Sequence, residues 1–377
     1  MKILLVILSL AFAVRCPAQG DEIWIYGKIN GHDVNLMFDT GCTAPFVIFS
    51  STAKRLGLKV TPFSAADKAG FASGAVGIVP SCRLTLSGTN FDAPVMVARD
   101  LRDSHEAVDG AIGWPVITQV LFLNGETGVM RQLTNVPPDL LDWPRFPIDT
   151  NFGDLVFDVP EQKIRVAVDT GSALGIELSP KQWSHWRSQH RRQPTTFESE
   201  ETIYGNSVLE ESWADEFALG DMNISSVPVI ESPLGNRTEM ILGQAALKRL
   251  YLIVDRRNGW IYLQPVKAPP RPYQHNRLGA VFLPKDSRSD ELIARVAPGS
   301  PAFEAGVRNG DVLMKLDGAD EAGWRRSTNS VSINSLEEKP AGTRLALELK
   351  RGDKIFTTTA VLRNIIPPNP TPKGVGS

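Results

Sequence analysis

The alternation of apolar and polar residues predicts the same set of short strands twice along the chain. Residues 23–38 (IWIYGKINGHDVNLMF) and 153–168 (GDLVFDVPEQKIRVAV) each contain two apolar, β-branched runs joined by a polar turn. Such alternating runs are typical of strands, because successive side chains of a strand point to opposite faces. Each pair of runs leads into an Asp-Thr-Gly tripeptide, at 39–41 and again at 169–171.

A second signal follows each tripeptide at the same distance. The interval along the chain from Asp39 to Gly113, in DGAIGW, equals the interval from Asp169 to Gly243, in EMILGQ. A single Asp-Thr-Gly is more often an ordinary turn at the end of a strand than a catalytic loop. The paired spacing instead indicates an internal repeat.

Other predicted elements recur in the same order. A helix is expected after each tripeptide, at 50–58 (SSTAKRLGL) and at 178–186 (LSPKQWSHW), where Ser179 is placed to cap the first turn and Pro180 to begin it. A strand–turn–strand then closes each copy, at 120–130 and at 252–263. Residues 22–133 and 154–264 are therefore predicted to be two copies of one mainly β unit.

The composition changes after the repeat. Four prolines in QPVKAPPRPYQHN (264–276) predict an extended, semi-rigid linker. The residues beyond it predict a strand ending at Val296, a short helix PAFEAG ending at Gly306, and a strand VLMKL that follows a tight turn. RLALELKRGDKIFTTTAVL (344–362) predicts a hairpin around Arg351-Gly352-Asp353.

Length and charge restrict the class of protein. A chain of 377 residues with 42% apolar residues is long enough for two or three compact units with sizeable cores. The formal net charge of −2 argues against a polyanionic partner. The most basic stretch, HWRSQHRRQ (185–193), is interpreted as the solvated end of a helix, and we expect no nucleic-acid partner.

The N-terminus has the pattern of an export signal. Lys2 is followed by a twelve-residue, almost entirely apolar run, which is too short for a transmembrane span of about 20, and small residues near Ala18 and Gly20 suit cleavage. Residues 1–20 are therefore predicted to be a signal peptide, and the mature protein to be periplasmic or extracellular without a stable membrane span. A lipoprotein anchored at Cys16 is the secondary interpretation, because the bulky Arg15 stands where a small residue normally precedes a lipidated cysteine.

The remaining polar chemistry offers no metal or cofactor motif. The five histidines are scattered, and no spacing of Cys and His is typical of a zinc site. Cys42 and Cys82 are compatible with a disulfide in an exported protein or with two free thiols, and the sequence leaves both open.

Two carboxylates at equivalent places in a repeat can form a catalytic pair. If a pseudo-twofold axis brings the two Asp-Thr-Gly loops face to face, the carboxylates cannot both ionise and must share a proton. The ionised partner can then deprotonate a water molecule while the protonated partner donates to a substrate carbonyl.

These motifs resemble those of the pepsin-type aspartic proteases, with lobes as short as a subunit of the retroviral type. The resemblance covers about 240 residues and implies two pseudo-symmetric acid-protease lobes. It also implies roles for individual residues: Asp39 and Asp169 as the catalytic pair, Thr40, Gly41, Thr170, Gly171 and Ser172 as support for the two loops, and Ile112-Gly113 and Leu242-Gly243 as the strands beneath them.

The chain departs from that family in three ways. Cys42 stands where Ser, Thr or Ala is usual, whereas Ser172 fits the second copy. A flap over the cleft is uncertain: Phe71 is the candidate in the first copy and Tyr204 in the second. Cleavage near residue 20 would also leave no long inhibitory pro-segment.

The C-terminal part resembles a PDZ domain of the bacterial exported-protease kind, carried mainly by GSPAFEAGVRNGDVL (299–313). The resemblance implies that Arg277, Leu278, Gly279 and Ala280 form a carboxylate-binding loop. It further implies that Val281 and Phe282 begin the strand to which a peptide with a free C-terminus would add. The alternative is a PDZ fold that packs or docks without such a ligand.

The sequence thus predicts a mainly β protein, with an α+β PDZ domain after the two lobes. The expected function is that of an exported aspartic endopeptidase acting on peptides or proteins without a cofactor, and the alternative is an inactive protease fold that binds peptides or acts as a scaffold. The predicted divisions are a signal peptide at 1–20, lobes at 21–135 and 136–264, a linker at 265–276, a PDZ domain at 277–364 and a disordered tail at 365–377.

Overall fold

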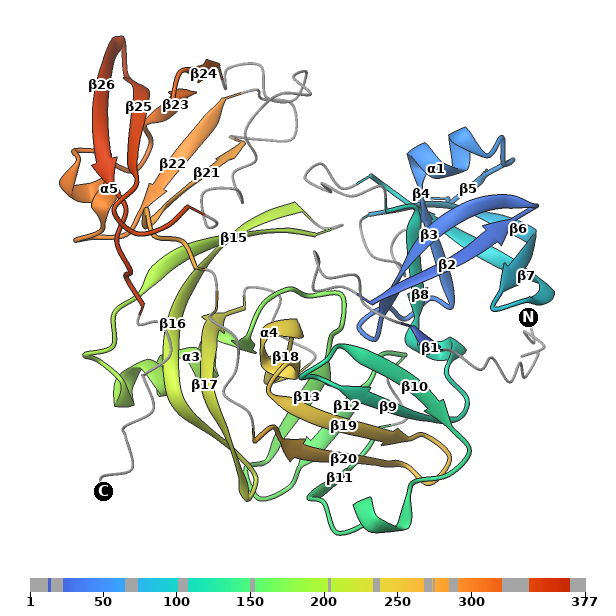
Figure 1. Ribbon diagram of the computed structural model, residues 1–377. Coiled ribbons are helices and arrows are strands. Elements are labelled where there is room, and N and C mark those ends of the chain that lie inside the picture. The colour runs from blue at the N-terminus through green and yellow to red at the C-terminus, as the bar shows by residue number, and fades with distance from the viewer. Residues whose placement is uncertain are drawn as a thin grey trace. The chain divides into compact units, whose positions relative to one another are not determined.

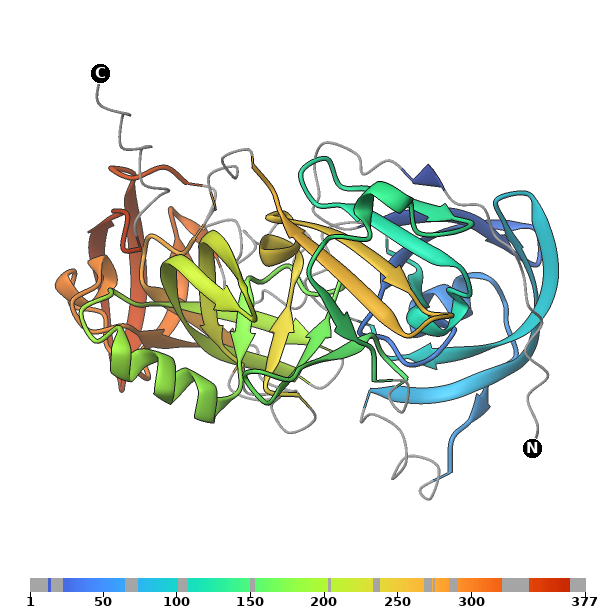
Figure 2. The same cartoon turned by 90° about the horizontal axis from the view of Figure 1, so that it is seen from below.

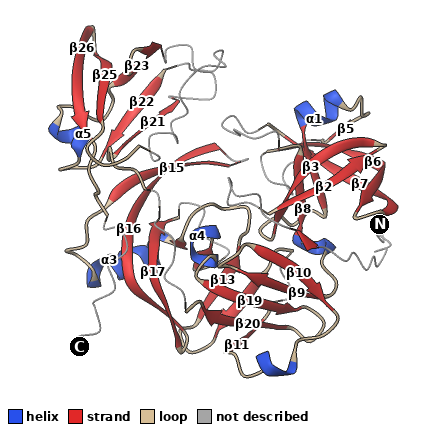
Figure 3. Ribbon diagram, in the orientation of Figure 1, coloured by secondary structure: helices blue, strands red, loops and turns tan. Residues whose placement is uncertain are grey.

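The computed structural model is mainly β, with short helices between its strands (Figures 1 and 3). Its chain divides into two compact units, the first comprising residues 1–182, 216–227 and 234–270, and the second comprising 183–215, 228–233 and 271–377. The structure describes residues 13–14, 23–64, 74–100, 108–149, 153–202, 205–232, 238–267, 273, 275–284, 291–320 and 339–366.

The first copy of the repeat forms a seven-stranded sheet in the order β2-β3-β8-β4-β7-β6-β5. Along β3, Val34, Leu36 and Phe38 are buried while the residues between them are partly exposed, as the alternation in the sequence predicts. The strands are Trp24–Ile29 (β2), His32–Asp39 (β3), Phe46–Phe49 (β4), Thr61–Pro62 (β5), Ala75–Leu86 (β6), Thr89–Ala98 (β7) and Gly110–Gly113 (β8), with α1 at Ser50–Arg55 and a 3-10 turn at Trp114–Val116.

The second copy forms a sheet with the same strand order, β12-β13-β18-β14-β17-β16-β15. In both sheets the strand before the tripeptide pairs in parallel with the strand that ends at the apolar-apolar-Gly signal. The elements are Val156–Val159 (β12), Ile164–Val168 (β13), Ile176–Leu178 (β14), Pro180–Gln189 (α3), Thr196–Thr202 (β15), Gly205–Leu219 (β16), Met222–Glu231 (β17), Met240–Leu242 (β18) and Gln244–Leu247 (α4).

Individual hydrogen bonds repeat at the same offset as the sequence motifs. The Asn35 N–H donates to Asp109 Oδ2 at 2.9 Å, and at the equivalent places of the second copy the Arg165 N–H donates to Glu239 Oε2 at 2.8 Å. The predicted cap of α3 is also present, because Ser179 Oγ accepts from the Gln182 N–H at 3.5 Å. The two copies are therefore related in backbone pairing as well as in sequence motifs.

A six-stranded sheet in the order β1-β10-β9-β19-β20-β11 joins the two copies (Figures 1 and 2). At its centre β9 and β19 are antiparallel, with Phe122 opposite Ile253 and Leu123 opposite Leu252. Asn124 pairs with Val129 in the first hairpin as Asp255 pairs with Trp260 in the second, so Phe122 and Ile253 are counterparts and face each other across a local twofold axis. The strands are Ala13–Val14 (β1), Val120–Asn124 (β9), Val129–Leu133 (β10), Arg145–Pro147 (β11), Leu250–Asp255 (β19) and Trp260–Pro265 (β20), with a 3-10 turn at Pro138–Leu140.

The C-terminal part of the second unit is a sheet in the order β21-β22-β23-β25-β26, with β24 beside β23 and one short helix. The predicted helix begins at Pro301 after Ser300, whose Oγ accepts from the Phe303 N–H at 3.2 Å. The predicted hairpin turns at Gly352-Asp353. The elements are Ala280–Pro284 (β21), Leu292–Val296 (β22), Pro301–Glu304 (α5), Val312–Leu316 (β23), Ala319–Asp320 (β24), Arg344–Arg351 (β25) and Lys354–Val361 (β26).

The β15–β16 hairpin comes from the second copy of the repeat, and its residues up to 215 belong to the same compact unit as this C-terminal sheet. The end of the predicted linker is part of that packing, because His275 and Asn276 are 1% and 4% exposed, and Thr196 Oγ1 donates to the Asn276 carbonyl at 2.9 Å. The stretch predicted as a linker, 265–276, thus has packed residues at both ends, because Pro265 is the last residue of β20. The two partners of this bond lie far apart along the chain, so no local pattern reveals it.

In the described part of the chain, no helix has the length and apolar character needed to cross a membrane. The predicted signal peptide lies outside the described residues except for the two residues of β1, which pair with β10.

A buried carboxyl in the hairpin makes the stability of the second unit depend on pH. Glu211 is fully buried, and desolvation together with the neighbouring Glu198 raises its pKa well above the ordinary value, although the Tyr273 hydroxyl partly offsets this. A raised folded-state pKa means that the folded state prefers the protonated form, so stability is full below the unfolded pKa and falls as pH rises toward the folded pKa.

We therefore expect Glu211→Gln, which keeps the shape and removes the charge, to be more stable than the wild type at pH 8 by about 1–3 kcal/mol. The difference should shrink toward pH 4, as measured by urea unfolding followed by tryptophan fluorescence. Glu216→Gln, at an exposed position of the same strand, is the control and should change stability little at either pH. A difference for Glu211→Gln that does not vary with pH would contradict the assignment.

Candidate active site

The two Asp-Thr-Gly loops begin where buried strands end. Asp39 is the last residue of β3 and lies opposite Gly113 of β8. Asp169 directly follows β13, and its N–H donates to the Leu242 carbonyl of β18 at 3.0 Å. Parallel pairing at both places carries each Asp to the same edge as the glycine of its own apolar-apolar-Gly signal.

Those two glycines leave room for the loops to fold back. A Cβ atom on Gly113 would lie 2.1 Å from the Ala44 carbonyl oxygen, and a Cβ atom on Gly243 would lie 2.5 Å from the Leu174 carbonyl oxygen. Both distances are far below van der Waals contact, so any larger residue would push the loop away. The apolar-apolar-Gly signal in the sequence is therefore a requirement of close backbone packing.

The two threonines brace the loops against each other. The Thr40 N–H donates to Thr170 Oγ1 at 3.1 Å, and the Thr170 N–H donates to Thr40 Oγ1 at 3.0 Å. Each hydroxyl also donates across the axis, from Thr40 to the Val168 carbonyl at 2.6 Å and from Thr170 to the Phe38 carbonyl at 2.7 Å. Both threonines are at most 2% exposed, so these four bonds are shielded from water.

The brace brings the two carboxyl groups face to face. The Gly41 and Gly171 N–H groups each donate at 2.8 Å to Oδ1 of the aspartate of their own loop. A Cβ atom on Gly41 would lie 2.6 Å from Asp169 Oδ2, and one on Gly171 would lie 2.8 Å from Asp39 Cγ. Each loop glycine thus lies directly against the opposite carboxyl.

Burial makes the pair hold a proton. Desolvation raises the pKa of both Asp39 and Asp169, and the negative charge of Asp169 raises that of Asp39 further. The two side chains also interact with each other, and because both cannot ionise at this separation they hold one proton between them. One acid and one base therefore lie side by side.

The residues after the two tripeptides differ in what they bind. Ser172 Oγ donates to Glu177 Oε1 at 2.7 Å and accepts from the Leu174 N–H at 3.2 Å, so the second loop is held by a buried polar network. Cys42 Sγ has only a weak donor contact, to the Ala44 carbonyl at 3.4 Å. Burial, followed by the charge of Asp39, raises the pKa of the Cys42 thiol to about 12, which keeps it neutral.

Both described cysteines, Cys42 and Cys82, are free, so the disulfide left open by the sequence is not formed. Among the described residues, no group of three or more His, Cys, Asp or Glu side chains is arranged to hold a metal ion.

A third carboxyl, Asp154, lies near the pair and was not predicted. The next residue, Leu155, donates its N–H to the Thr40 carbonyl at 3.1 Å and accepts from the Val168 N–H at 2.9 Å, so this segment contacts both loops. Asp154 Oδ1 is buried and has no hydrogen-bond partner among the described residues. Its negative charge adds to the rise in the pKa of Asp169 and of Cys42. In the sequence Asp154 is a single polar residue before an apolar strand, and that pattern does not indicate a place near the pair.

Other predicted site residues lie elsewhere. Phe71 and Tyr204, the flap candidates, fall outside the described residues. Residues 277–282 lie in the second compact unit, where Val281 and Phe282 are buried in β21 and the Arg277 side chain donates to Asn364 Oδ1 at 2.9 Å.

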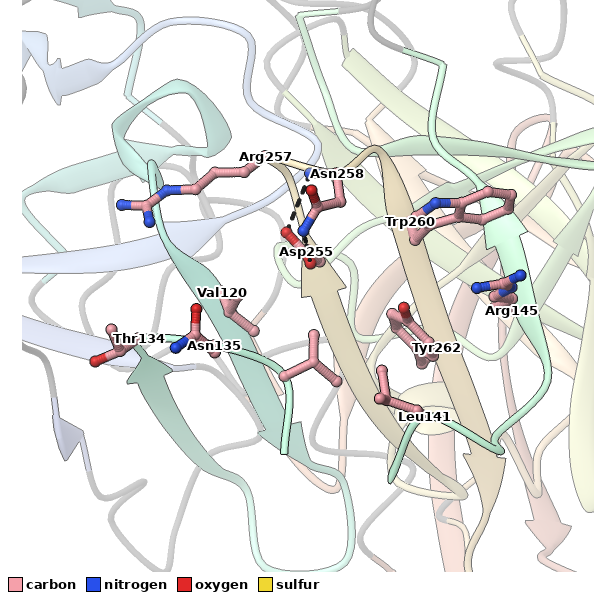
Figure 4. A pocket seen from close by; sticks show the side chains of 11 residues that line it. Val120, Thr134, Asn135, Leu141, Arg145, Asp255, Arg257, Asn258, Trp260 and Tyr262 are labelled. Carbon is pink, nitrogen blue, oxygen red and sulfur yellow. Dashed lines mark hydrogen bonds between the residues drawn. The ribbon is translucent and has the colours of Figure 1, made fainter. Parts of the chain in front are cut away.

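A separate cavity of about 500 Å³ lies over the six-stranded sheet (Figure 4). At its wall Asp255 accepts from both the backbone and the side-chain N–H of Asn258, at 3.2 and 2.6 Å. Neither aspartate of the pair lines this cavity, so it is not part of the candidate active site. Its lining residues are Val120, Thr134, Asn135, Val136, Leu141, Arg145, Asp255, Arg257, Asn258, Trp260 and Tyr262.

Comparison with known proteins points to proteases. A family model described as aspartyl protease matches residues 25–116, which include the first loop and the strand beneath it. A relative named as serine protease HhoA, from Synechocystis sp., is 38% identical over 79 residues, which cover 19% of this chain. The match spans 18% of that relative's length.

The threonine brace predicts a specific loss of stability. Thr40→Val or Thr170→Val keeps the shape of the side chain but leaves a buried N–H and a buried carbonyl of the opposite loop without partners. We expect each variant to lower the free energy of unfolding by about 1–3 kcal/mol, measured in urea. The matched variants Thr40→Ser and Thr170→Ser retain the hydroxyl and should keep most of the stability. Equal losses for Val and Ser would mean that methyl packing, and not the hydrogen bonds, holds the loops.

Asp154 predicts a shift in the titration of the pair. Removing its negative charge in Asp154→Asn should lower the pKa of Asp169, because the ionised form is then less opposed, whereas Asp154→Glu should leave it nearly unchanged. Carbon-13 NMR of labelled aspartate side chains measures this directly and needs no enzymatic activity. An unchanged titration in Asp154→Asn would show that this carboxyl does not act on the pair.

Proposed function

We propose that this protein is an exported aspartic endopeptidase whose two β copies act as pepsin-type lobes. The observation that carries the proposal is the pair of facing carboxyls, Asp39 and Asp169, held by reciprocal threonine hydrogen bonds. Export is part of the proposal and rests on the sequence pattern of residues 1–20.

The proposed reaction uses one water molecule and no covalent intermediate. The ionised partner of the Asp39–Asp169 pair takes a proton from the water, whose oxygen attacks the carbonyl carbon of the scissile peptide bond. The protonated partner donates its proton to the carbonyl oxygen, giving a neutral tetrahedral diol. Collapse of the diol breaks the C–N bond, a proton passes to the leaving amine, and the pair returns to its singly protonated state.

The surroundings of the loops favour this mechanism over attack by a serine. A serine nucleophile needs a base such as histidine within hydrogen-bonding reach. Ser172, the serine next to the pair, instead donates to the Glu177 carboxyl. The likeness to a relative named as a serine protease therefore supports a protease but not its chemistry in this chain.

We further propose that the C-terminal sheet and helix α5 form a PDZ-like domain that recognises peptides. The order of strand, short helix and strand over 292–316 and the terminal hairpin support it. Packing begins just before the first predicted residue of this domain, because His275 and Asn276 are buried.

Single substitutions at the pair test the proposed activity. Asp39→Asn and Asp169→Asn should each abolish turnover of a peptide library, measured by mass spectrometry, while exposed Asp221→Asn should retain wild-type turnover. Cleavage in ¹⁸O-labelled water should place the label in the new carboxyl group. Since burial raises the pKa of both aspartates, activity should follow a bell-shaped pH profile centred above the usual range of aspartate titration.

The outcomes separate the two candidate functions. Turnover that survives either Asn variant would rule out the pair as the catalytic centre. A folded protein that binds peptides but cleaves none of them would identify the inactive, peptide-binding alternative.

A further inference from the structure

Asn276 uses the whole hydrogen-bonding capacity of its side chain inside the second compact unit. Its Oδ1 accepts from the Leu278 and Gly279 N–H groups, both at 3.0 Å. Its Nδ2 donates to the Ala280 carbonyl at 2.9 Å and to the Phe197 carbonyl at 2.8 Å. A carboxamide has two donors and two acceptor positions, so all four are occupied.

The turn that supplies these amides is tightly built. Gly279 has φ +67°, a conformation that side chains disfavour, and a Cβ atom there would lie 2.3 Å from Ser300 Cβ. The Leu278 carbonyl accepts from the Ala302 N–H of α5 at 3.0 Å. Two neighbouring N–H groups in a rigid turn are a suitable site for a carboxylate, and here an uncharged oxygen of the same chain fills it.

Asn276 also holds the β15–β16 hairpin, through its side chain and its backbone carbonyl. The bond from Asn276 Nδ2 to Phe197 and the bond from Thr196 Oγ1 to the Asn276 carbonyl both end on β15. Among the described residues β21, which starts at Ala280, pairs with β22 alone and ends its sheet. The amide turn, the edge of the sheet and the hairpin therefore meet at Asn276.

We propose that Asn276 is an internal stand-in for a peptide C-terminus, and that a C-terminal carboxylate binding to the Leu278 and Gly279 amides displaces it and releases the β15–β16 hairpin. The proposal rests on the proposed peptide recognition by the C-terminal domain, but it does not rest on catalysis. The ligand is a C-terminal carboxylate, its competitor is the Asn276 side chain, and the consequence is a released hairpin within the second unit.

Binding of a peptide to the turn and the contact of Asn276 with the hairpin must oppose each other. If the carboxylate and the Asn276 oxygen compete for the same two amides, the hairpin contact lowers peptide affinity by the same factor by which peptide loosens the hairpin. A charged acceptor makes stronger hydrogen bonds than a neutral amide oxygen, so a carboxylate can compete despite the cost of displacement.

The experiment is hydrogen exchange of the full chain carrying Asp39→Asn, so that the probe is not consumed. The probe is a short peptide ending in valine, prepared with a free and with an amidated C-terminus. We expect the free peptide to raise exchange of the β15 and β16 amides about tenfold at saturation, and the amidated peptide to leave it unchanged. Binding is measured in parallel by calorimetry.

Two variants at Asn276 isolate the contact. Asn276→Ala frees both turn amides and removes the side-chain bond to Phe197 of β15, so the hairpin should exchange faster without peptide. The free peptide should then bind roughly tenfold more tightly, since each of the two regained hydrogen bonds is worth about a threefold change in affinity. Asn276→Asp keeps an acceptor for both amides but has no donor for Phe197, so it should loosen the hairpin and abolish peptide binding. Asn364→Ala, which removes a partner of Arg277 on the same turn, should behave as the parent.

The results distinguish the coupling to the hairpin from peptide recognition itself. A free peptide that binds without changing exchange of the hairpin would overturn the coupling and leave peptide recognition intact. Unchanged affinity in Asn276→Ala would show that Asn276 does not occupy the ligand site. If the peptide binds to neither the parent nor Asn276→Ala, both the coupling and the peptide-recognising role are wrong, while protease activity is unaffected by that result. Should Asn276→Ala fail to fold, the loss of binding in Asn276→Asp tests the competition alone.

Discussion

Two buried carboxyl groups that face each other cannot both carry a negative charge, and the first compact unit is built around this constraint. Burial raises the pKa of Asp39 and Asp169, and their hydrogen bond leaves one proton between them. Such a pair keeps its geometry only if the two loops cannot drift apart. The threonine hydrogen bonds hold the two loops together locally, and the central pairing of β9 with β19 holds the two copies together.

The repeat explains why the two loops meet, and its imperfections explain why their carboxyls differ. Ser172 ties the second loop to the buried Glu177, whereas Cys42 in the first loop has only a weak contact. Gln244, from the helix after the second glycine, donates to the Thr170 carbonyl at 2.8 Å, where the first copy has Trp114. Asp154 adds a further negative charge near Asp169. The two carboxyls therefore lie in different surroundings, although sharing one proton requires only that both cannot ionise together.

The second unit depends on a different kind of contact. Its core is apolar and continuous, but a polar side chain, Asn276, fixes where the hairpin of the second copy lies against the C-terminal turn. A buried amide whose bonds are all satisfied specifies one arrangement, since any shift leaves buried groups unpaired. If a ligand binds to the same turn amides, the ligand and the Asn276 side chain compete for them.

The sequence by itself determined the features that local chemistry encodes. Alternation predicted the strands, Ser179 and Pro180 predicted the start of α3, and the equal spacing from each aspartate to its glycine predicted which of these residues come together. These predictions succeed because strand alternation, helix capping and a repeated motif each leave a mark within a few residues or at a fixed interval.

Only the tertiary structure decided the contacts between segments with no shared pattern. Asp154 lies near the pair because the next residue, Leu155, is hydrogen-bonded to Thr40. Asn276 holds the hairpin because Thr196 of β15 is hydrogen-bonded to it. The free state of Cys42 and Cys82 likewise depended on where the folded chain placed two thiols. A lone polar residue has the same appearance in sequence whether it faces water or a catalytic loop, and the difference lies in packing across long stretches of chain.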